Sequence, residues 1–180
     1  MRILDTILGG ALFLTAVFLI GGFLIPSEWS ISRSIVVHAN IKEIYPLVSN
    51  FREWSKWSPW SSAKDSTLRY TYSGPEVGVG SKQSWTSKTM GNGWMECTSV
   101  TLEDEVGYDL YIDIGFLQST LYGNIKFISE NNDTKVIWID KGWSDKNLLK
   151  RWMNLVMKRM LSKDIDICLS GLKTLVEKSH

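Results

Sequence analysis

The sequence has few of the residues from which catalytic and metal centres are usually built. Its 180 residues include two cysteines, Cys97 and Cys168, and two histidines, of which His180 ends the chain. Two distant cysteines form neither a disulfide framework nor a zinc site, which takes about four ligands. His38 has no base partner or orienting group near it in the sequence, so we expect it to have a structural role. The sequence therefore predicts no metal site and no catalytic residue.

An excess of charge is also missing. The formal net charge is +1, which provides no general attraction to nucleic acid. The glycine-rich segment 74–80 precedes an expected strand rather than a helix, and it lacks the Gly-Lys-Ser/Thr of a phosphate loop. We therefore interpret it as a turn and expect no cofactor. The nine tryptophans, by contrast, supply ample apolar area for a folded core.

One long run near the N-terminus has no charge. Ile7 to Ile25 contains Thr15 as its only polar side chain, and a helix of this length rises about 28 Å, close to the roughly 30 Å hydrocarbon core of a bilayer. A cleaved signal peptide is the alternative, but its apolar region is usually about 7–15 residues. We expect residues 1–26 to be a retained single-pass anchor and residues 27–180 a separate domain. Basic residues are nearly balanced across the run, so the positive-inside rule leaves the side of the domain open.

The remaining chain alternates between two periodicities. A β-branched strand at 31–38 precedes two short helices, at 42–49 and 51–57. A long C-terminal helix, capped by Ser144 or Asp145, carries an apolar stripe from Leu149 to Leu175 that includes Met160 and Cys168. Between them, period-two segments joined by short turns predict an antiparallel meander, with strands at 67–72, 81–86, 94–101, 106–114, 119–128 and 135–141.

Several distinct local motifs lie along residues 30–178. They are Arg33–Val37 before a helix, Phe51–Trp60, Tyr72–Pro75 with Gly78-Val79-Gly80, Trp85, and Gly171–Leu175. Together they resemble the START-like helix-grip (SRPBCC) superfamily, and within it the polyketide cyclase/dehydratase-like proteins. The resemblance implies an α+β helix-grip fold, in which a curled seven-stranded antiparallel sheet surrounds the C-terminal helix. It also implies a cavity between sheet and helix, which in relatives holds a lipid or another hydrophobic molecule.

Large rings and flexible methionines are the candidates for lining that cavity, because ligand pockets are mostly apolar and aromatic. The alternative is that the rings simply fill the core. The candidates are Trp57, Trp60, Tyr72, Trp85, Tyr108, Trp138, Trp152, Met153, Met157 and Met160. Cys168 lies on the apolar stripe, so we expect a buried and unreactive thiol.

The leading hypothesis is a membrane-anchored binding protein for a lipid or other hydrophobic small molecule, rather than an enzyme. Two alternatives remain open. One is an enzyme of the cyclase/dehydratase type, in which Tyr, Asp or His38 moves protons inside the same cavity. The other is an interaction module that regulates a partner at the membrane. The expected partners are therefore a hydrophobic ligand and the bilayer, without nucleic acid.

Overall fold

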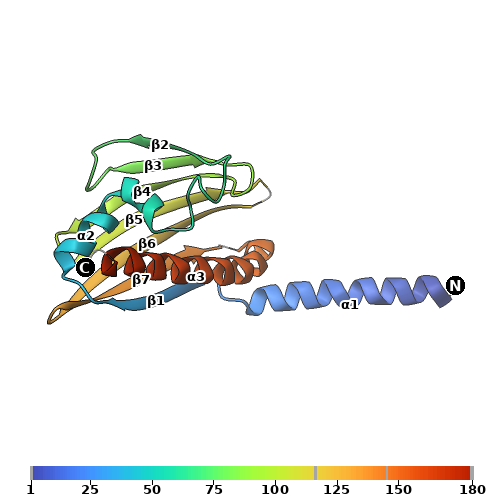
Figure 1. Ribbon diagram of the computed structural model, residues 1–180. Coiled ribbons are helices and arrows are strands. Elements are labelled where there is room, and N and C mark those ends of the chain that lie inside the picture. The colour runs from blue at the N-terminus through green and yellow to red at the C-terminus, as the bar shows by residue number, and fades with distance from the viewer. Residues whose placement is uncertain (1, 116, 145, 179–180) are drawn as a thin grey trace.

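The computed structural model describes residues 2–115, 117–144 and 146–178. Figure 1 shows a long N-terminal helix that projects from an α+β domain. The elements, in chain order, are α1 (Arg2–Leu24), β1 (Glu28–Val37), α2 (Ile41–Ser49), the 3-10 helix η1 (Phe51–Lys56), β2 (Arg69–Ser73), β3 (Lys82–Thr86), β4 (Asn92–Thr101), β5 (Glu105–Asp113), β6 (Gln118–Glu130), β7 (Asp133–Trp143) and α3 (Leu148–Glu177).

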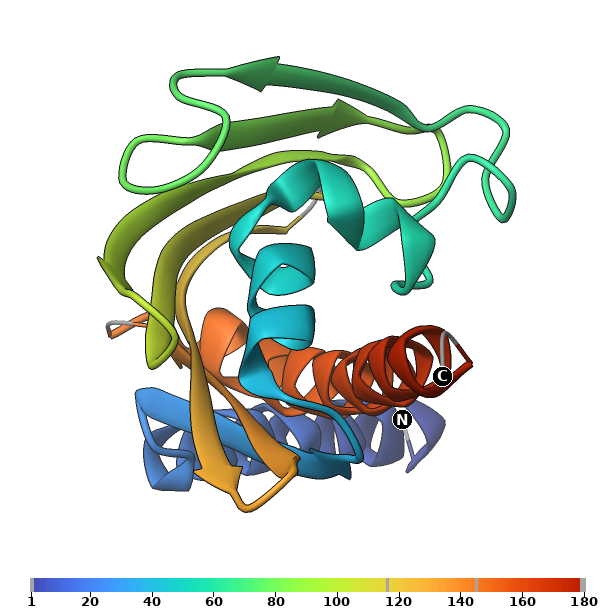
Figure 2. The same ribbon diagram turned by 60° about the vertical axis from the view of Figure 1, so that its left-hand side comes forward.

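The seven strands form one antiparallel sheet in the order β1-β7-β6-β5-β4-β3-β2. Strands β2 to β7 form a simple meander, and β1 pairs with β7 as the edge strand on that side. Figure 2 shows the sheet curving around α2 and α3, and η1 lies beside β3. On β5 the inward positions Val106, Tyr108 and Leu110 are buried, as the alternation predicts. The predicted helix-grip fold is confirmed.

Helix α3 presents one continuous face to the sheet. Apart from the adjacent pair Cys168 and Leu169, its buried residues step by three or four positions, which is the spacing of a single helical face. They are Asn154, Met157, Leu161, Ile165, Cys168, Leu169, Leu172 and Val176. The predicted stripe was wrong at Leu149 and Met160, which are 58% and 55% exposed, because the inward face passes between them through Asn154 and Met157. The cap is Asn147, whose side chain accepts a hydrogen bond from the Lys150 N–H. Of the two predicted caps, Ser144 was wrong, and Asp145 lies outside the described residues.

Helix α1 contacts the domain through the first turns of α3. The Trp152 indole N–H donates to the Phe18 carbonyl at 3.1 Å, and the two rings stack at 6.4 Å. A Cβ on Gly21 would overlap the Trp152 ring, so the glycine allows this close approach. The Arg151 guanidinium donates to the carbonyls of Gly22, Phe23 and Ile25, where the end of α1 leaves acceptors without helical partners.

The described part of α1 is long and apolar enough to cross a membrane. Residues Ile3–Leu24 have a mean hydropathy of 2.3, and only 6% of the most apolar window is buried by the rest of the protein. Nearly all of this apolar surface is therefore exposed apart from the contact with α3. Surface of that extent is exceptional for a protein surrounded by water.

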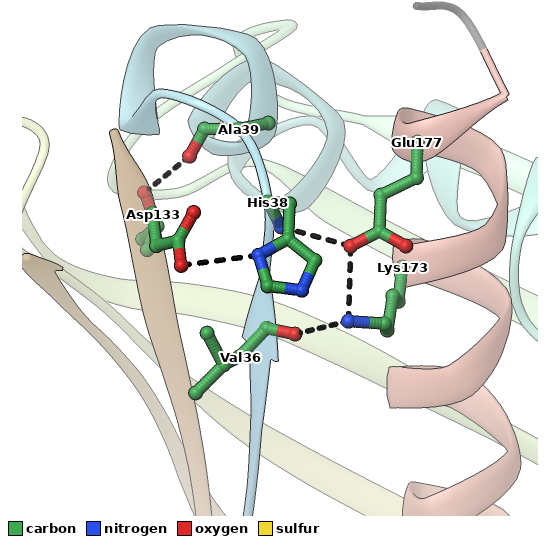
Figure 3. A network of polar contacts seen from close by, with 7 residues as sticks. Val36, His38, Ala39, Asp133, Lys173 and Glu177 are labelled. Carbon is green, nitrogen blue, oxygen red and sulfur yellow. Dashed lines mark hydrogen bonds and ion pairs between the residues drawn. The ribbon is translucent and has the colours of Figure 1, made fainter. Parts of the chain in front are cut away.

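A polar network fastens the opposite end of α3 to the sheet (Figure 3). The His38 backbone N–H donates to Glu177 at 2.8 Å, and the Lys173 ammonium reaches both Glu177 and the Val36 carbonyl. The His38 ring contacts the Asp133 carboxylate at 3.0 Å, so it does have a partner, distant in sequence. Since these bonds join β1, β7 and α3, they support the structural role expected of His38.

Candidate functional site

Four aromatic rings meet between the sheet and the helices. Trp54 of η1 lies 5.0 Å from Trp57, 5.2 Å from Trp138 and 5.9 Å from Tyr108, measured between ring centroids. The indole N–H of Trp54 donates to the Val48 carbonyl at 2.8 Å, which fixes the ring from the side of α2. All four rings are buried. Edge-to-face and tilted contacts of this kind are the preferred geometry of aromatic pairs.

The ring cluster encloses one carboxyl group, that of Asp140 on β7. Tyr108 donates its hydroxyl proton to Asp140 Oδ1 at 2.8 Å, and the Tyr108 oxygen accepts from the Trp138 indole N–H at 2.7 Å. The same indole N–H also lies 3.2 Å from Asp140 Oδ1. Asp140 is 2% exposed. This triad is therefore a short chain of hydrogen bonds within an apolar interior.

Burial dominates the electrostatics of this triad. It raises the pKa of Asp140 to about 6, although the hydrogen bonds from Tyr108 and Trp138 act in the opposite direction. Burial and the nearby Asp140 charge raise the pKa of Tyr108 well above its ordinary value. A carboxyl group that titrates near neutral pH beside a phenol can take up and release a proton, which is the property required of a general acid or base.

A glycine allows the tyrosine and the aspartate to meet. Tyr108 on β5 pairs with Gly123 on β6, which in turn pairs with Asp140 on β7. A Cβ on Gly123 would overlap the Tyr108 ring. Because this position has no side chain, the ring crosses over β6 and reaches the carboxylate two strands away.

The thiol of Cys168 lies near enough to the triad for the Asp140 charge to affect its pKa. The residue is fully buried, and burial raises its thiol pKa well above the ordinary value, with Asp164 and Asp140 acting in the same direction. The expected burial of the thiol is confirmed, and its low reactivity stays a prediction.

A separate open pocket of about 510 Å³ lies at the end of the sheet where β6 begins and β7 ends. The pocket combines aromatic rings with polar side chains, and its lining is more polar than that of most small-molecule sites. It is lined by Tyr111, Leu117, Gln118, Ser119, Thr120, Tyr122, Trp143, Lys150 and Asn154. Lys150 and Asn154 belong to the first two turns of α3, beside the contact with α1. Figure 1 shows this start of α3 at the end of the domain from which α1 projects.

The structure distributes the ten predicted cavity residues over several environments. Trp57, Tyr108, Trp138 and Met157 are buried in the interior between sheet and helices. Met153, Trp60 and Trp85 pack partly buried against that core. The other three lie elsewhere: Tyr72 is half-buried under the Arg52 guanidinium, Trp152 packs on α1, and Met160 is exposed.

None of the residues that line the pocket of about 510 Å³ was predicted, and neither were two buried polar residues, Asp140 and Asn154. Asp140 follows Val136 and Trp138 on the inward face of β7, so it interrupts an apolar alternation. Asn154 does the same on the inward stripe of α3, before Met157. A polar residue at an apolar position of a periodic pattern was the available signal in both cases. Among the described residues, no group of three or more His, Cys, Asp or Glu side chains could hold a metal ion.

Comparison with known proteins supports the fold and identifies a family model. The family model described as "Polyketide cyclase / dehydrase and lipid transport" matches residues 28–177. No curated protein matches the sequence.

Three solved structures illustrate the similarity in fold. Norcoclaurine synthase from Thalictrum flavum has a TM-score of 0.62 at 13% identity, covering 83% of this chain and 86% of its own. Ara h 8.0201 has a TM-score of 0.61 at 10% identity, covering 84% and 99%. A protein from Chromobacterium violaceum has a TM-score of 0.59 at 14% identity, covering 82% and 96%. At these identities the likeness extends to the fold alone.

Proposed function

Because the chain belongs to the family of polyketide cyclase/dehydrase and lipid-transport proteins, we propose that it is a membrane-anchored binding protein for a lipid or other hydrophobic small molecule. One observation carries the proposal. The pocket of about 510 Å³ takes two of its lining residues from the same turns of α3 that pack against the apolar helix α1. If α1 lies in a bilayer, the pocket is held next to the source of hydrophobic ligands.

The anchoring role of residues 1–26 rests on the exposed apolar surface of α1 and on its attachment to α3. A tryptophan and an arginine, Trp152 and Arg151, bind the last turns of the helix. These residue types favour the interface between hydrocarbon and water. A signal sequence that is removed after export would have no reason to make such contacts with the mature domain.

We further propose that the inward-facing members of the predicted set contact the ligand. Trp57, Tyr108, Trp138 and Met157 are buried between the sheet and α3, with Met153 at the border of this core, and none of them lines the pocket of about 510 Å³. Rings and methionines offer a large and adaptable apolar surface to such a molecule. Met153→Ala would then weaken ligand binding more than it lowers the free energy of unfolding.

Two measurements test the proposal. The intact chain expressed in cells should stay in the membrane pellet through high-salt and carbonate washes, and mass spectrometry should find an uncleaved N-terminus. Extraction of the purified chain with organic solvent should then release a bound hydrophobic molecule that mass spectrometry identifies. Release by carbonate, or a mature terminus near residue 27, would exclude the anchor. An empty protein that captures a defined membrane partner would favour the interaction module.

The hydrogen-bonded pair of Asp140 and Tyr108 favours a second candidate function, an enzyme of the cyclase/dehydratase type. The raised pKa of Asp140, about 6, suits a group that exchanges protons with a bound substrate. In this alternative the pair would donate and remove protons while the cavity folds a reactive chain. Incubation with polyketide-type substrates separates the candidates, since only the enzyme would convert them, and Asp140→Asn would abolish the conversion.

A further inference from the structure

The pocket at the start of α3 contains a buried polar group that the described chain leaves unsatisfied. Asn154 is 8% exposed and lines the pocket, and its Nδ2 has no hydrogen-bond partner among the described residues. Buried donors without acceptors are costly and rare in native proteins, so each one calls for an explanation. An acceptor atom supplied by a bound molecule is the explanation that the position of Asn154 favours.

The charge of the pocket indicates which acceptor would bind. Lys150 lies one helical turn before Asn154, at the i, i+4 spacing that puts two side chains on the same face, and both line the pocket. The start of β6 adds Gln118, Ser119 and Thr120, of which Gln118 already donates its amide Nε2 to the Asp113 carboxylate at 3.0 Å. None of the described lining residues is acidic. An ammonium beside amide and hydroxyl donors suits an anionic oxygen, either of a carboxylate or of a phosphate.

The other lining residues provide an apolar surface. Trp143 and Tyr122 are 56% and 57% exposed, although both are large aromatic side chains. Exposed rings at the edge of a pocket are available to cover the hydrocarbon part of a ligand. The pocket therefore combines anionic recognition with apolar contact, which is the chemistry of an amphiphile.

The opposite face of the same helical turns binds α1. Leu148 and Trp152 are also four residues apart, and they pack on Gly22 and Gly21. Residues 152 and 154 differ by two positions, or about 200° around a helix, so the α1 contact and the pocket lie on opposite sides of α3. The pocket is thus separated from the anchor by roughly one helix diameter, about 10 Å.

We infer that this pocket is a headgroup site: it holds the anionic head of a single-chain amphiphile against Asn154 and Lys150, with the hydrocarbon covered by the neighbouring rings. The inference rests on the proposed function, because it names the class of hydrophobic ligand. The amide Nδ2 of Asn154 donates to the head, and the Lys150 ammonium neutralises its charge.

Photo-crosslinking with the full chain in phosphatidylcholine nanodiscs tests the headgroup site. The probe is palmitate carrying a diazirine near its carboxylate, and mass spectrometry maps the labelled peptides. The label should fall on the start of β6 or the first turns of α3. Palmitate and palmitoyl lysophosphatidate should compete with the probe, whereas hexadecanol, which has the same chain and no charge, should not. The stronger of the two anionic competitors distinguishes a carboxylate head from a phosphate head.

Substitutions separate a binding role of Asn154 from a structural one. Asn154→Leu should reduce labelling by about tenfold to a hundredfold, the effect of losing a hydrogen bond to a charged group. Its melting temperature should not fall, because the amide Nδ2 has no hydrogen-bond partner to lose in the described part of the chain. Lys150→Gln should weaken labelling in the same direction. Lys158→Gln is the matched control, since Lys158 is an exposed residue of α3 outside the pocket.

The possible failures are distinguishable. If hexadecanol competes as well as palmitate, or if Asn154→Leu labels like the unmodified protein, the headgroup site is wrong. Labelling elsewhere in the interior would also overturn it, while leaving hydrophobic ligand binding intact. If no label enters residues 27–180, both the headgroup site and the proposed function fail.

Discussion

Replacing Asp140 by asparagine should change how the stability of the protein depends on pH. The carboxyl group is 2% exposed and has a pKa of about 6 in the folded protein, against an ordinary value of 3.8. Asparagine has nearly the same shape, and its amide oxygen can still accept from Tyr108 and Trp138. The substitution therefore removes the ionisation while it keeps most of the packing.

The sign and size of the effect follow from linkage. A pKa raised by folding means that the folded protein disfavours the charged form, so ionisation of Asp140 lowers the free energy of unfolding. At a pH below about 3.8 the carboxyl group is protonated in both states, and this penalty is absent. The penalty grows as the pH rises and is complete above about 6. A difference of about two pKa units corresponds to about 3 kcal/mol. Asp140→Asn should remove this loss of folding free energy between about pH 4 and about pH 7.

Urea titrations of the intact chain in a mild nonionic detergent, followed by tryptophan fluorescence, measure the free energy of unfolding at each pH. The difference between the unmodified protein and Asp140→Asn isolates the contribution of this one group. Tyr108→Phe removes a hydrogen bond that lowers the Asp140 pKa. In this variant the loss of folding free energy should therefore continue to a higher pH. Parallel profiles for the unmodified protein and Asp140→Asn would refute the reasoning.

Three further predictions concern the packing around Tyr108, the burial of Cys168 and the charge of Glu177. Gly123→Ala should lower the free energy of unfolding by about 1–3 kcal/mol, because its Cβ would overlap the Tyr108 ring; Gly10→Ala, with nothing within 4 Å, should leave the melting curve unchanged. Cys168 should resist a thiol reagent until urea unfolds the chain, and rapid labelling of the native protein would contradict its burial. The backbone N–H of His38 is the chief cause of the lowered Glu177 pKa, so ionised Glu177 stabilises the fold above about pH 4.5. This stabilisation is lost as the pH falls, and urea titrations of Glu177→Gln should lack that acid sensitivity.

Local patterns in the sequence accounted for the elements and their order. The uncharged run specified α1, the period of two specified the strands, and Cys168 fell on the inward face of α3 as expected. These predictions succeeded because side-chain periodicity and turn residues act over a few positions. Even so, the N-cap of α3 lies at Asn147, beyond the residues predicted for it.

The site depended on contacts between segments that are far apart in the chain. The sequence determined that Tyr108 points inward, but only the register β5-β6-β7 places Gly123 under its ring and Asp140 beyond it. Likewise, Trp152 was predicted to line the cavity, and the tertiary structure turned it towards α1 and left Asn154 facing the pocket. Periodicity in the sequence indicates which side chains are buried. Strand pairing and helix packing decide what those side chains contact, and both depend on segments that are distant in the sequence.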